Sequence, residues 1–371
     1  MGDVLHALPA VSALRAMFPW AEVGWAIEER WAELLRSAGH PPRSPEMPLV
    51  DRVHIVNTRV WRKQLFSGKT WTEILAAKRE LREVDYDVAL DFQGAWKSAA
   101  VALASGAPVR LGFRDPREHA ATMFYTRSRN AEGTHVVEQN LSLLTGLTPA
   151  GEEEQAANRL SNLRQSPPVP QLPRDERQEA WAEEELARHG FVPHDFAILN
   201  PGAGWGAKCW AAESYGQVAR GLAKLGLPSV VNFGPNEEAL AQAVVQAGNG
   251  AAWALPASLS QLIAMMRRAR IFVGGDTGPM HLAAALRVPV VGIFGPTNPA
   301  RNGPYATEAI VLRSSESVTN HSRRAGPDDA MLSISPVEVL AAAQDLLSRE
   351  RSRRALVVFP VRPDHLEAAR E

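Results

Sequence analysis

The chain of 371 residues is long enough for two domains that each bury a hydrophobic core. Its 40 Lys and Arg residues balance 41 Asp and Glu residues, so no global field attracts nucleic acid or a membrane surface. Cys209 is the single cysteine, which excludes an internal disulfide and a cysteine metal cluster and fits a reducing compartment. We find neither a signal-peptide pattern nor an apolar run near the roughly 20 residues of a membrane span, and therefore expect a cytoplasmic protein that does not bind nucleic acid.

Short β-branched runs alternate with helical patterns along the chain, which predicts βαβ units and parallel sheets. An apolar helical pattern over 4–15 follows Gly2 and Asp3. A strand over 22–28 precedes a helix over 29–38, and a strand over 87–93 precedes a helix over 96–104. In the second half we expect strands at 196–200, 229–234, 271–276 and 288–295, and helices at 213–225, 237–247, 281–287 and 336–348.

A segment rich in proline and charge, residues 161–178, separates the two halves. Because this composition favours neither a helix nor a central strand, we place a linker near residues 160–175. The prediction is an α/β protein with two doubly wound Rossmann-like domains, at 1–165 and 176–350, and a tail at 351–371. Ligands of such folds bind where the carboxyl ends of the strands meet, so we expect a site in a cleft between the domains.

The strongest local signal is the motif GGDTGPMH at 274–281. After the strand, Asp276 and Thr277 are expected to cap the next helix, Gly278 lets a ligand approach the backbone, and His281 lies in the first turn. The free N–H groups and partial positive charge of a helix start suit a diphosphate, to which the imidazole would add a hydrogen bond. An ordinary helix cap followed by a core histidine is an equally open interpretation of this motif alone.

Two further motifs suit a nucleotide. NPGAGWGAKCW follows the strand at 196–200, and its glycines allow close backbone approach while Lys208 supplies a positive charge for phosphate. In FGPNEEALA, Glu237 follows a strand end and opens a helix, where it is able to accept hydrogen bonds from ribose hydroxyls. Taken singly, the first motif is equally a surface loop and the second a stabilising charge at a helix start.

Several residues of the first half are candidates for catalysis or acceptor binding. Asp3 has the chemical type of a general base, although on its own the residue is better explained as a helix cap. Basic residues in loops after predicted strands would hold a phosphorylated acceptor, unless they are solvated surface; they are Arg59, Arg62, Lys63, Lys97 and Arg117. Asp85 and Asp87 form a DxD pattern that precedes a strand rather than following one, so we predict no metal site there. An NAD site is disfavoured because no GxGxxG follows a strand at the start of either half.

The motifs MGDVLHALPA, WRKQLF, DFQGAWKSAA, REHAATMFY, GAKCW, FGPNEE and GGDTGPMHLAAAL resemble, in that order, the landmarks of the bacterial heptosyltransferases, glycosyltransferase family nine. The resemblance spans residues 1 to about 300, and the first-half motifs are similar to type I members rather than type II members. It implies a GT-B fold. It also implies an inverting transfer, without metal or cofactor, from ADP-L-glycero-β-D-manno-heptose to the Kdo sugar of Kdo-lipid A in lipopolysaccharide core synthesis.

By position, the resemblance makes Asp3 the general base and Glu237 a ribose contact. It assigns the diphosphate to Lys208, Asp276, Thr277, Gly278 and His281, and the anionic acceptor to the five basic residues of the first half. A lipid-anchored acceptor implies peripheral contact with the inner membrane, and we expect a monomer. Family members begin with an apolar strand before the GD motif, so we expect a longer natural chain and a first sheet that lacks this strand here. Two alternatives stay open: another acceptor with the same donor, as in type II or a later core transferase, and a nucleotide-binding protein without catalysis.

Overall fold

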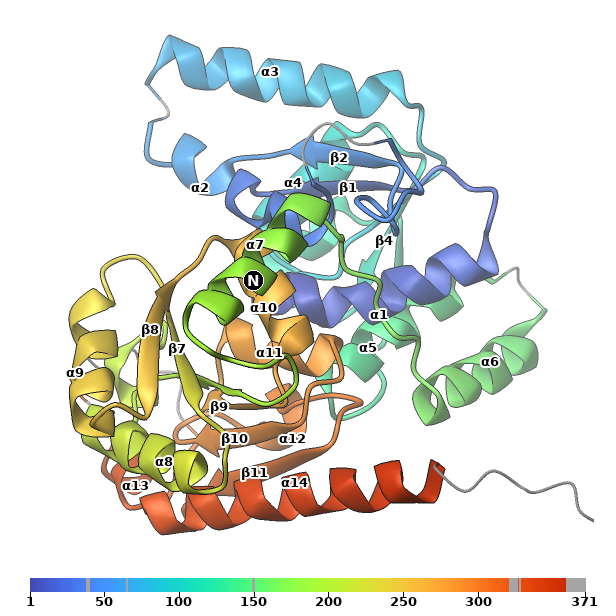
Figure 1. The fold of residues 1–371 in the computed structure, drawn as a ribbon. Helices are drawn as coiled ribbons and strands as arrows, with labels where there is room; N and C mark the ends of the chain where they lie inside the picture. Colours follow the sequence, from blue (N-terminus) through green and yellow to red (C-terminus); the bar gives the residue numbers. More distant parts are fainter. Residues whose placement is uncertain (38–40, 65, 149–150, 320–325, 327, 358–371) are drawn as a thin grey trace, which may run out of the picture.

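The structure is a computed structural model that describes residues 1–357 except 38–40, 65, 149–150, 320–325 and 327 (Figure 1). In the N-terminal half the elements, with η for 3-10 helices, are α1 (Gly2–Met17), β1 (Gly24–Ile27), η1 (Glu29–Leu34), β2 (Arg52–Ile55), α2 (Thr58–Trp61), α3 (Gly68–Glu83), β3 (Val88–Leu90), α4 (Trp96–Ala104), β4 (Val109–Phe113), η2 (His119–Phe124), β5 (Arg127–Arg129), α5 (Val136–Leu143), η3 (Leu144–Leu147) and α6 (Glu153–Gln165).

In the C-terminal half the elements are α7 (Glu176–Arg188), β6 (Ala197–Asn200), η4 (Gly206–Lys208), α8 (Ala212–Lys224), β7 (Ser229–Phe233), α9 (Glu238–Gly248), β8 (Ala252–Pro256), α10 (Leu259–Arg268), β9 (Ile271–Gly275), α11 (Gly278–Ala285), β10 (Val290–Phe294), α12 (Pro299–Asn302), β11 (Ala309–Arg313), α13 (Asp329–Leu332) and α14 (Pro336–Val357). No described helix is long and apolar enough to cross a membrane.

The C-terminal half is built on one parallel sheet with the strand order β11-β10-β9-β6-β7-β8. All residues of β6, β9 and β10 are buried, which agrees with their continuous apolar sequence and with helices on both faces. The chain order reverses between β6 and β9, because β7 and β8 lie on one side of this pair and β10 and β11 on the other. The prediction of a doubly wound sheet is confirmed here, and such a switch point is where ligands bind.

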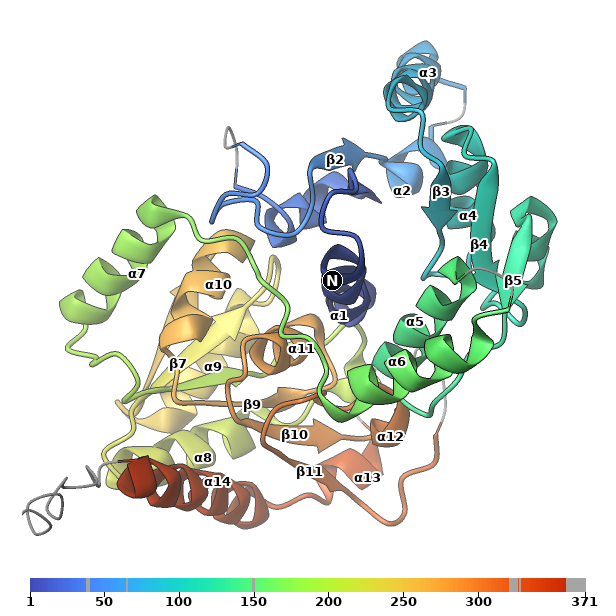
Figure 2. The ribbon, with the colours of Figure 1, turned by 90° about the vertical axis from the view of Figure 1, so that its right-hand side faces the viewer.

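The parallel strands of the N-terminal half form two separate sheets, β1–β2 and β3–β4–β5. The sequence analysis predicted a doubly wound sheet that lacks its first strand here; the parallel βα character is confirmed, and the described strands form these two sheets rather than one. Neither β1 nor β3 is paired on its second edge with another described strand. Helix α1 runs between this half and the C-terminal half, as Figure 2 shows.

The two halves share a hydrophobic core through α1, although the length of the chain suggested a separate core for each. Leu5 and Leu8 of α1 belong to one buried cluster with Met265 of α10 and Leu282 of α11. A second cluster lies within the C-terminal half, between its sheet and helices α8, α9 and α14. Because α1 is held by apolar packing against the C-terminal half, its first turn has a defined position beside helix α11.

Four predicted boundaries differ from the structure. Helix α1 begins at Gly2, so Asp3 lies inside its first turn and is not a cap. The helix predicted over 29–38 is the shorter 3-10 helix η1, with residue 38 outside the described residues. Helix α6 continues to Gln165 despite the nearby prolines, so the predicted linker is non-helical only over 166–175. Helix α14 extends to Val357 into the predicted tail, whose residues 358–371 lie outside the described chain.

The contact between α8 and α9 depends on a glycine. A Cβ on Gly216 would lie 2.4 Å from Cβ of Ala247, whereas a Cβ on Gly68 would meet nothing within 4 Å. We therefore expect Gly216→Ala to lower the free energy of unfolding by about 1–3 kcal/mol through overpacking. The control Gly68→Ala should change it by less than about 0.5 kcal/mol. Denaturant unfolding of both variants measures this, and equal effects would contradict the packing of α8 on α9.

Candidate active site

Two loops of the C-terminal half meet at the switch point between β6 and β9. The loop after β6 carries Gly202 and Lys208, and the loop after β9 carries Asp276 and Thr277. Asn200 joins them, because its Nδ2 donates to Gly202 O at 2.9 Å and lies 3.4 Å from Oγ1 of Thr277. Asn232, at the end of β7, in turn donates from Nδ2 to Asn200 Oδ1 at 2.6 Å. The sequence analysis did not single out either asparagine, although both stand at strand ends beside glycine-rich turns.

Lys208 and His281 converge on the buried carboxylate of Asp276. Lys208 Nζ lies 2.7 Å from Asp276 Oδ2 and 3.1 Å from Asp276 O, and His281 Nε2 lies 3.2 Å from Asp276 Oδ1. Burial alone would raise the pKa of Asp276, but the hydrogen bond and charge of His281 and those of Lys208 outweigh it and hold the pKa well below its ordinary value. Asp276 is therefore ionised at neutral pH, and Lys208 is a fixed charge rather than a snorkelling surface lysine.

The start of α11 presents backbone N–H groups at the same place. Thr277 is the N-cap residue, but its side chain makes no capping hydrogen bond and lies 3.3 Å from Gly275 O instead. The predicted position of Thr277 as N-cap is therefore confirmed, but neither its side chain nor that of Asp276 caps the helix, since both are directed to other partners. Gly278 is required for close packing, because a Cβ there would lie 2.5 Å from Sδ of Met1. A helix start without a side-chain cap keeps its N–H groups available to an anion.

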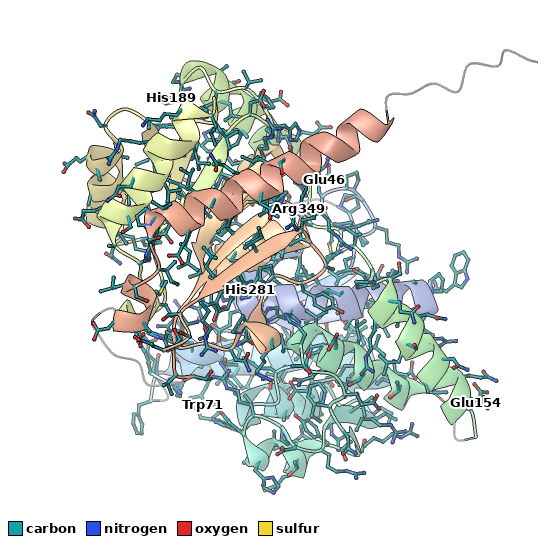
Figure 3. All side chains as sticks on the ribbon, turned by 90° about the horizontal axis from the view of Figure 1, so that it is seen from below. Glu46, Trp71, Glu154, His189, His281 and Arg349 are labelled. Carbon is teal, nitrogen blue, oxygen red and sulfur yellow. The ribbon has the colours of Figure 1, made fainter. Side chains whose placement is uncertain are left out.

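His6 of α1 completes this arrangement from the N-terminal half. Its Nε2 lies 3.1 Å from Nδ1 of His281, and both side chains are buried. Figure 3 shows His281 in the middle of the molecule, beside α1. Both ring nitrogens of His281 thus face protein partners, Asp276 on one side and His6 on the other. In this arrangement His281 positions the loop and has no ring nitrogen left for the phosphate bond predicted from the sequence.

The protonation of these histidines follows from their surroundings. Burial first, and then the neighbouring His281 and His135, lower the pKa of His6 well below 6.5. Burial also lowers the pKa of His135, whose Nδ1 accepts from Val137 N at 3.1 Å while Nε2 lies 3.0 Å from Gly303 O. The ionised carboxylate of Asp276 can only accept, so His281 donates to it from Nε2, whereas the direction of the hydrogen bond between His6 Nε2 and His281 Nδ1 depends on the tautomers. A small cavity beside these rings is lined by both halves, including Leu5, Val137 and Tyr305.

Glu237 stands next to the glycine-rich loop, as its predicted role requires. It is the N-cap residue of α9, and its Oε2 accepts from Gly234 N at 2.8 Å. A Cβ on Gly202 would lie only 2.2 Å from Glu237 Oε2, so a larger residue there would displace this carboxylate. The carboxylate is half-buried between the ends of β6 and β7, on the β7 side of the Lys208 site.

Asp3 lies on α1, three residues before His6. It is exposed in the first turn of the helix. The preceding residue packs on the site, because a Cβ on Gly2 would lie 3.2 Å from Cδ2 of His281. The start of α1 thus stands against the start of α11, with Asp3 at the residue that follows Gly2.

The five predicted acceptor-binding residues occupy two places in the N-terminal half. Arg59 lies in α2, followed closely by Arg62 and Lys63, so these three are in helical or turn positions rather than in a long loop. Lys97 is in the first turn of α4, and Arg117 is in the segment between β4 and η2. Among the described residues, none of the five side chains has a hydrogen-bonding or ion-pair partner, and only Lys97 is half-buried. They are not in contact with Lys208 or Asp276.

Asp91 organises the segment that carries Lys97, and the sequence analysis did not select it. Its buried carboxyl group follows β3 and accepts hydrogen bonds from Gln93 N, Gly94 N and Ser98 Oγ. It also accepts from the hydroxyl of Tyr125 at 2.7 Å. The backbone of Arg117 lies beside Gly94, because its N would be 3.1 Å from a Cβ on that glycine. The next residue, Glu118, donates from its backbone N to Gly94 O at 2.9 Å.

The residues of the DxD pattern lie in the turn between α3 and β3, before a strand as predicted. Asp85 has a φ of 56°. The hydroxyl oxygen of Tyr86, the residue between the two aspartates, lies 2.8 Å from Nε2 of His54. Within the described part of the chain, no three His, Cys, Asp or Glu side chains are grouped so that they could hold a metal ion.

Comparison with known proteins identifies the family of this chain. Residues 74–328 match the model of glycosyltransferase family 9 (heptosyltransferase). The chain is 32% identical over 327 residues to the lipopolysaccharide heptosyltransferase 1 of Pseudomonas aeruginosa, covering 85% of this chain and 81% of that protein. It is 30% identical over 319 residues to the protein of the same name from Escherichia coli strain K12, covering 85% and 91%. The solved structure of E. coli heptosyltransferase WaaC with ADP-2-deoxy-2-fluoro heptose has a TM-score of 0.68 and 26% identity, covering 93% of this chain and 96% of that one.

The chain is therefore a glycosyltransferase with the GT-B fold. It belongs to glycosyltransferase family 9, the heptosyltransferases. The resemblance found in the sequence motifs is confirmed.

The buried histidines predict a pH dependence of stability. The folded-state pKa values of His6 and His135 lie below the ordinary 6.5, so the unfolded chain binds more protons as the pH falls below that value. Stability is then fully present above pH 6.5 and declines by about 1 kcal/mol per histidine for each pH unit below it. We expect His6→Leu to be less stable at pH 7.5, because His281 loses its partner, but to lose less stability on acidification to pH 5.5. Denaturant unfolding at both pH values measures this, and equal losses in the variant and the parent protein would contradict the assignment.

Proposed function

We propose that this heptosyltransferase transfers heptose from ADP-heptose to the Kdo sugar of Kdo-lipid A during synthesis of the lipopolysaccharide inner core. The observation that carries the proposal is the meeting of a helix start, Lys208 and the Asp276–His281 pair with the first turn of α1, which bears Asp3. The two relatives named lipopolysaccharide heptosyltransferase 1, and the related structure that contains an ADP-heptose analogue, support the same donor and acceptor.

The donor would bind across the switch point of the C-terminal sheet. The diphosphate would lie at the start of α11, against backbone N–H groups near Thr277 and Gly278. The ammonium group of Lys208 has three N–H donors and uses two of them on Asp276, which leaves one for phosphate. Glu237 lies on the β7 side of this position, at a glycine that lets a nucleotide approach, and would accept hydrogen bonds from the ribose hydroxyls.

The reaction would be a single displacement with inversion. Asp3 takes the proton of the acceptor hydroxyl as that oxygen bonds to the anomeric carbon. The bond between the anomeric carbon and the β-phosphate oxygen breaks, and its electron pair leaves with ADP. Lys208 and the start of α11 stabilise the charge that develops on the leaving diphosphate, and Asp276 with His281 holds both in place. The transfer proposed here takes no cofactor and no metal ion.

The acceptor would bind to the N-terminal half. Its Kdo carboxylate and lipid A phosphates are anionic, and Arg59, Arg62, Lys63, Lys97 and Arg117 offer cationic groups that other described side chains do not occupy. We further propose that the enzyme works as a monomer at the cytoplasmic face of the inner membrane, with peripheral contact only. That location follows from a lipid-anchored acceptor and a chain whose described helices do not span a bilayer.

Release of ADP from ADP-heptose, with and without Kdo-lipid A, tests the proposed function. Release that depends on the acceptor and yields a heptosylated product is the expected result. Release only with a core acceptor that already carries heptose would move the assignment to another core transferase. ADP binding without release on any acceptor would make the chain a nucleotide-binding protein and overturn the proposal.

The general base is tested by Asp3→Asn, with Asp85→Asn as the matched control. Because an amide cannot take the acceptor proton, turnover should fall at least about 100-fold. Donor affinity should stay close to that of the parent protein, since Asp3 would not bind ADP. Asp85→Asn should keep full turnover, because asparagine tolerates its left-handed backbone. Loss of turnover in the control but not in Asp3→Asn would instead point to the DxD residues.

The acceptor site is tested by reversing charge at Arg62 and Lys97. Each of Arg62→Glu and Lys97→Glu should raise the KM for Kdo-lipid A at least about tenfold by repelling its anionic groups. The KM for ADP-heptose should change little, because neither side chain contacts the donor loops. Arg177→Glu, an exposed position on α7, is the control. Unchanged acceptor KM values would place the acceptor elsewhere.

A further inference from the structure

Helix α3 projects from the N-terminal half and leaves most of its surface to solvent. Figures 1 and 2 both show it at the outer edge of the molecule, away from the C-terminal half. Only Thr70 and Leu81 of its 16 residues are buried. Trp71 is 52% exposed and Leu75 is 62% exposed, and Figure 3 shows Trp71 at the periphery. Two large apolar side chains on one solvent-facing helix are more than isolated surface residues require.

The exposed residues follow a single line along the helix. Trp71 and Leu75 are four residues apart, Lys78 and Arg79 follow at the next turn, and Arg82 comes one turn later. Leu75, Lys78, Arg79 and Arg82 line a surface depression together with Glu83. Arg79 lies 3.6 Å from Glu83 and Arg82 Nε lies 3.2 Å from Ala104 O, contacts that leave both residues exposed. We call Trp71, Leu75, Lys78, Arg79 and Arg82 the α3 stripe.

The chain just before α3 extends the same character. Phe66 is fully exposed at 105%, and Val60 of α2 is 47% exposed. Residues 59–83 contain seven basic and three acidic residues, whereas the whole chain has a net charge of −1. This segment therefore has a net charge of +4 where aromatic and aliphatic side chains are exposed, which is the combination that interfacial helices use.

We propose that the α3 stripe is the surface by which the enzyme rests on an anionic lipid bilayer. Trp71 and Leu75 would enter the headgroup region, where amphipathic aromatic rings are favoured, and the basic residues would contact lipid phosphates. The charge complementarity selects a lipid surface over an uncharged apolar partner. The inference rests on the proposed lipid-anchored acceptor: Arg59, Arg62 and Lys63 directly precede the stripe, so a headgroup held by them would keep its acyl chains in the bilayer beside α3.

Sedimentation of the full chain with vesicles tests this surface. The parent protein should bind vesicles of phosphatidylglycerol and phosphatidylethanolamine, bind phosphatidylcholine vesicles much more weakly, and be released by high salt. Lys78→Glu with Arg79→Glu should weaken binding at least about tenfold, because each lysine or arginine near an anionic surface contributes about fivefold in affinity. Trp71→Ser with Leu75→Ser should also weaken binding, and the remaining binding should still be released by high salt because the basic residues are unchanged.

Matched controls lie outside the stripe. Trp20 is 91% exposed and Val337 76% exposed, so Trp20→Ser with Val337→Ser removes similar apolar surface elsewhere. Lys224→Glu with Arg177→Glu reverses two exposed charges on the C-terminal half. Both control pairs should bind vesicles like the parent protein. Equal binding by stripe and control variants, or no binding by the parent protein, would overturn the proposal. So would a dimer of the parent protein that the stripe variants lose, because the stripe would then face a second copy.

Activity on two forms of the acceptor separates this surface from the proposed function. With Kdo-lipid A in anionic vesicles, the stripe variants should lose at least about fivefold in kcat/KM. With the same acceptor dispersed in non-ionic detergent, they should match the parent protein. Equal loss in both forms would make the stripe part of the acceptor site and overturn the membrane role. If no form of the acceptor is used but vesicle binding still depends on the stripe, the proposed function fails and the membrane surface stands.

Discussion

The ionised carboxylate of Asp276 is the constraint on which the rest of the site depends. A buried charge is tolerated only where donors surround it, and here Lys208 and His281 supply them. The other ring nitrogen of His281 in turn needs a hydrogen-bonding partner, and His6 provides it from α1. Satisfying one carboxylate therefore fixes the lysine, the start of α11 and the first helix of the other half in one geometry. The donor-side loop and the helix that bears Asp3 are positioned by the same chain of hydrogen bonds.

The local motifs of the C-terminal half could be read from the sequence because their chemistry is local. Glycines at strand ends, Glu237 before a helix and a continuous apolar strand each follow from backbone geometry and burial. The resemblance then placed them in one family, which the comparisons confirm. The motifs did not predict which hydrogen-bonding partner each side chain contacts. Asp276 and Thr277 look like capping residues in the sequence, yet one binds Lys208 and the other lies against a carbonyl.

The parts that the sequence did not predict depend on contacts between distant segments. His6 and His281 are 275 residues apart, and no spacing rule links them. Asp91 was quoted within a motif, but its role requires Tyr125 to fold back onto the carboxyl end of β3. The shared core also depends on distant contacts. Helix α1 has no distinct apolar face in its sequence, and it is buried because both halves pack around it. Local propensity carries little information about such tertiary choices.

The measurement that tests this account most directly is the ¹⁵N NMR spectrum of the histidine rings at pH 7.5, assigned with His6→Asn and His281→Asn variants. We predict that the ring of His6 is neutral, that His281 carries a proton on Nε2 which it donates to Asp276, and that Nε2 of His6 and Nδ1 of His281 share one hydrogen bond. Loss of His6 should shift the Nδ1 resonance of His281 in particular. An unprotonated Nε2 of His281, or a His281 resonance that is unchanged by the removal of His6, would contradict the hydrogen-bond chain that joins the two halves.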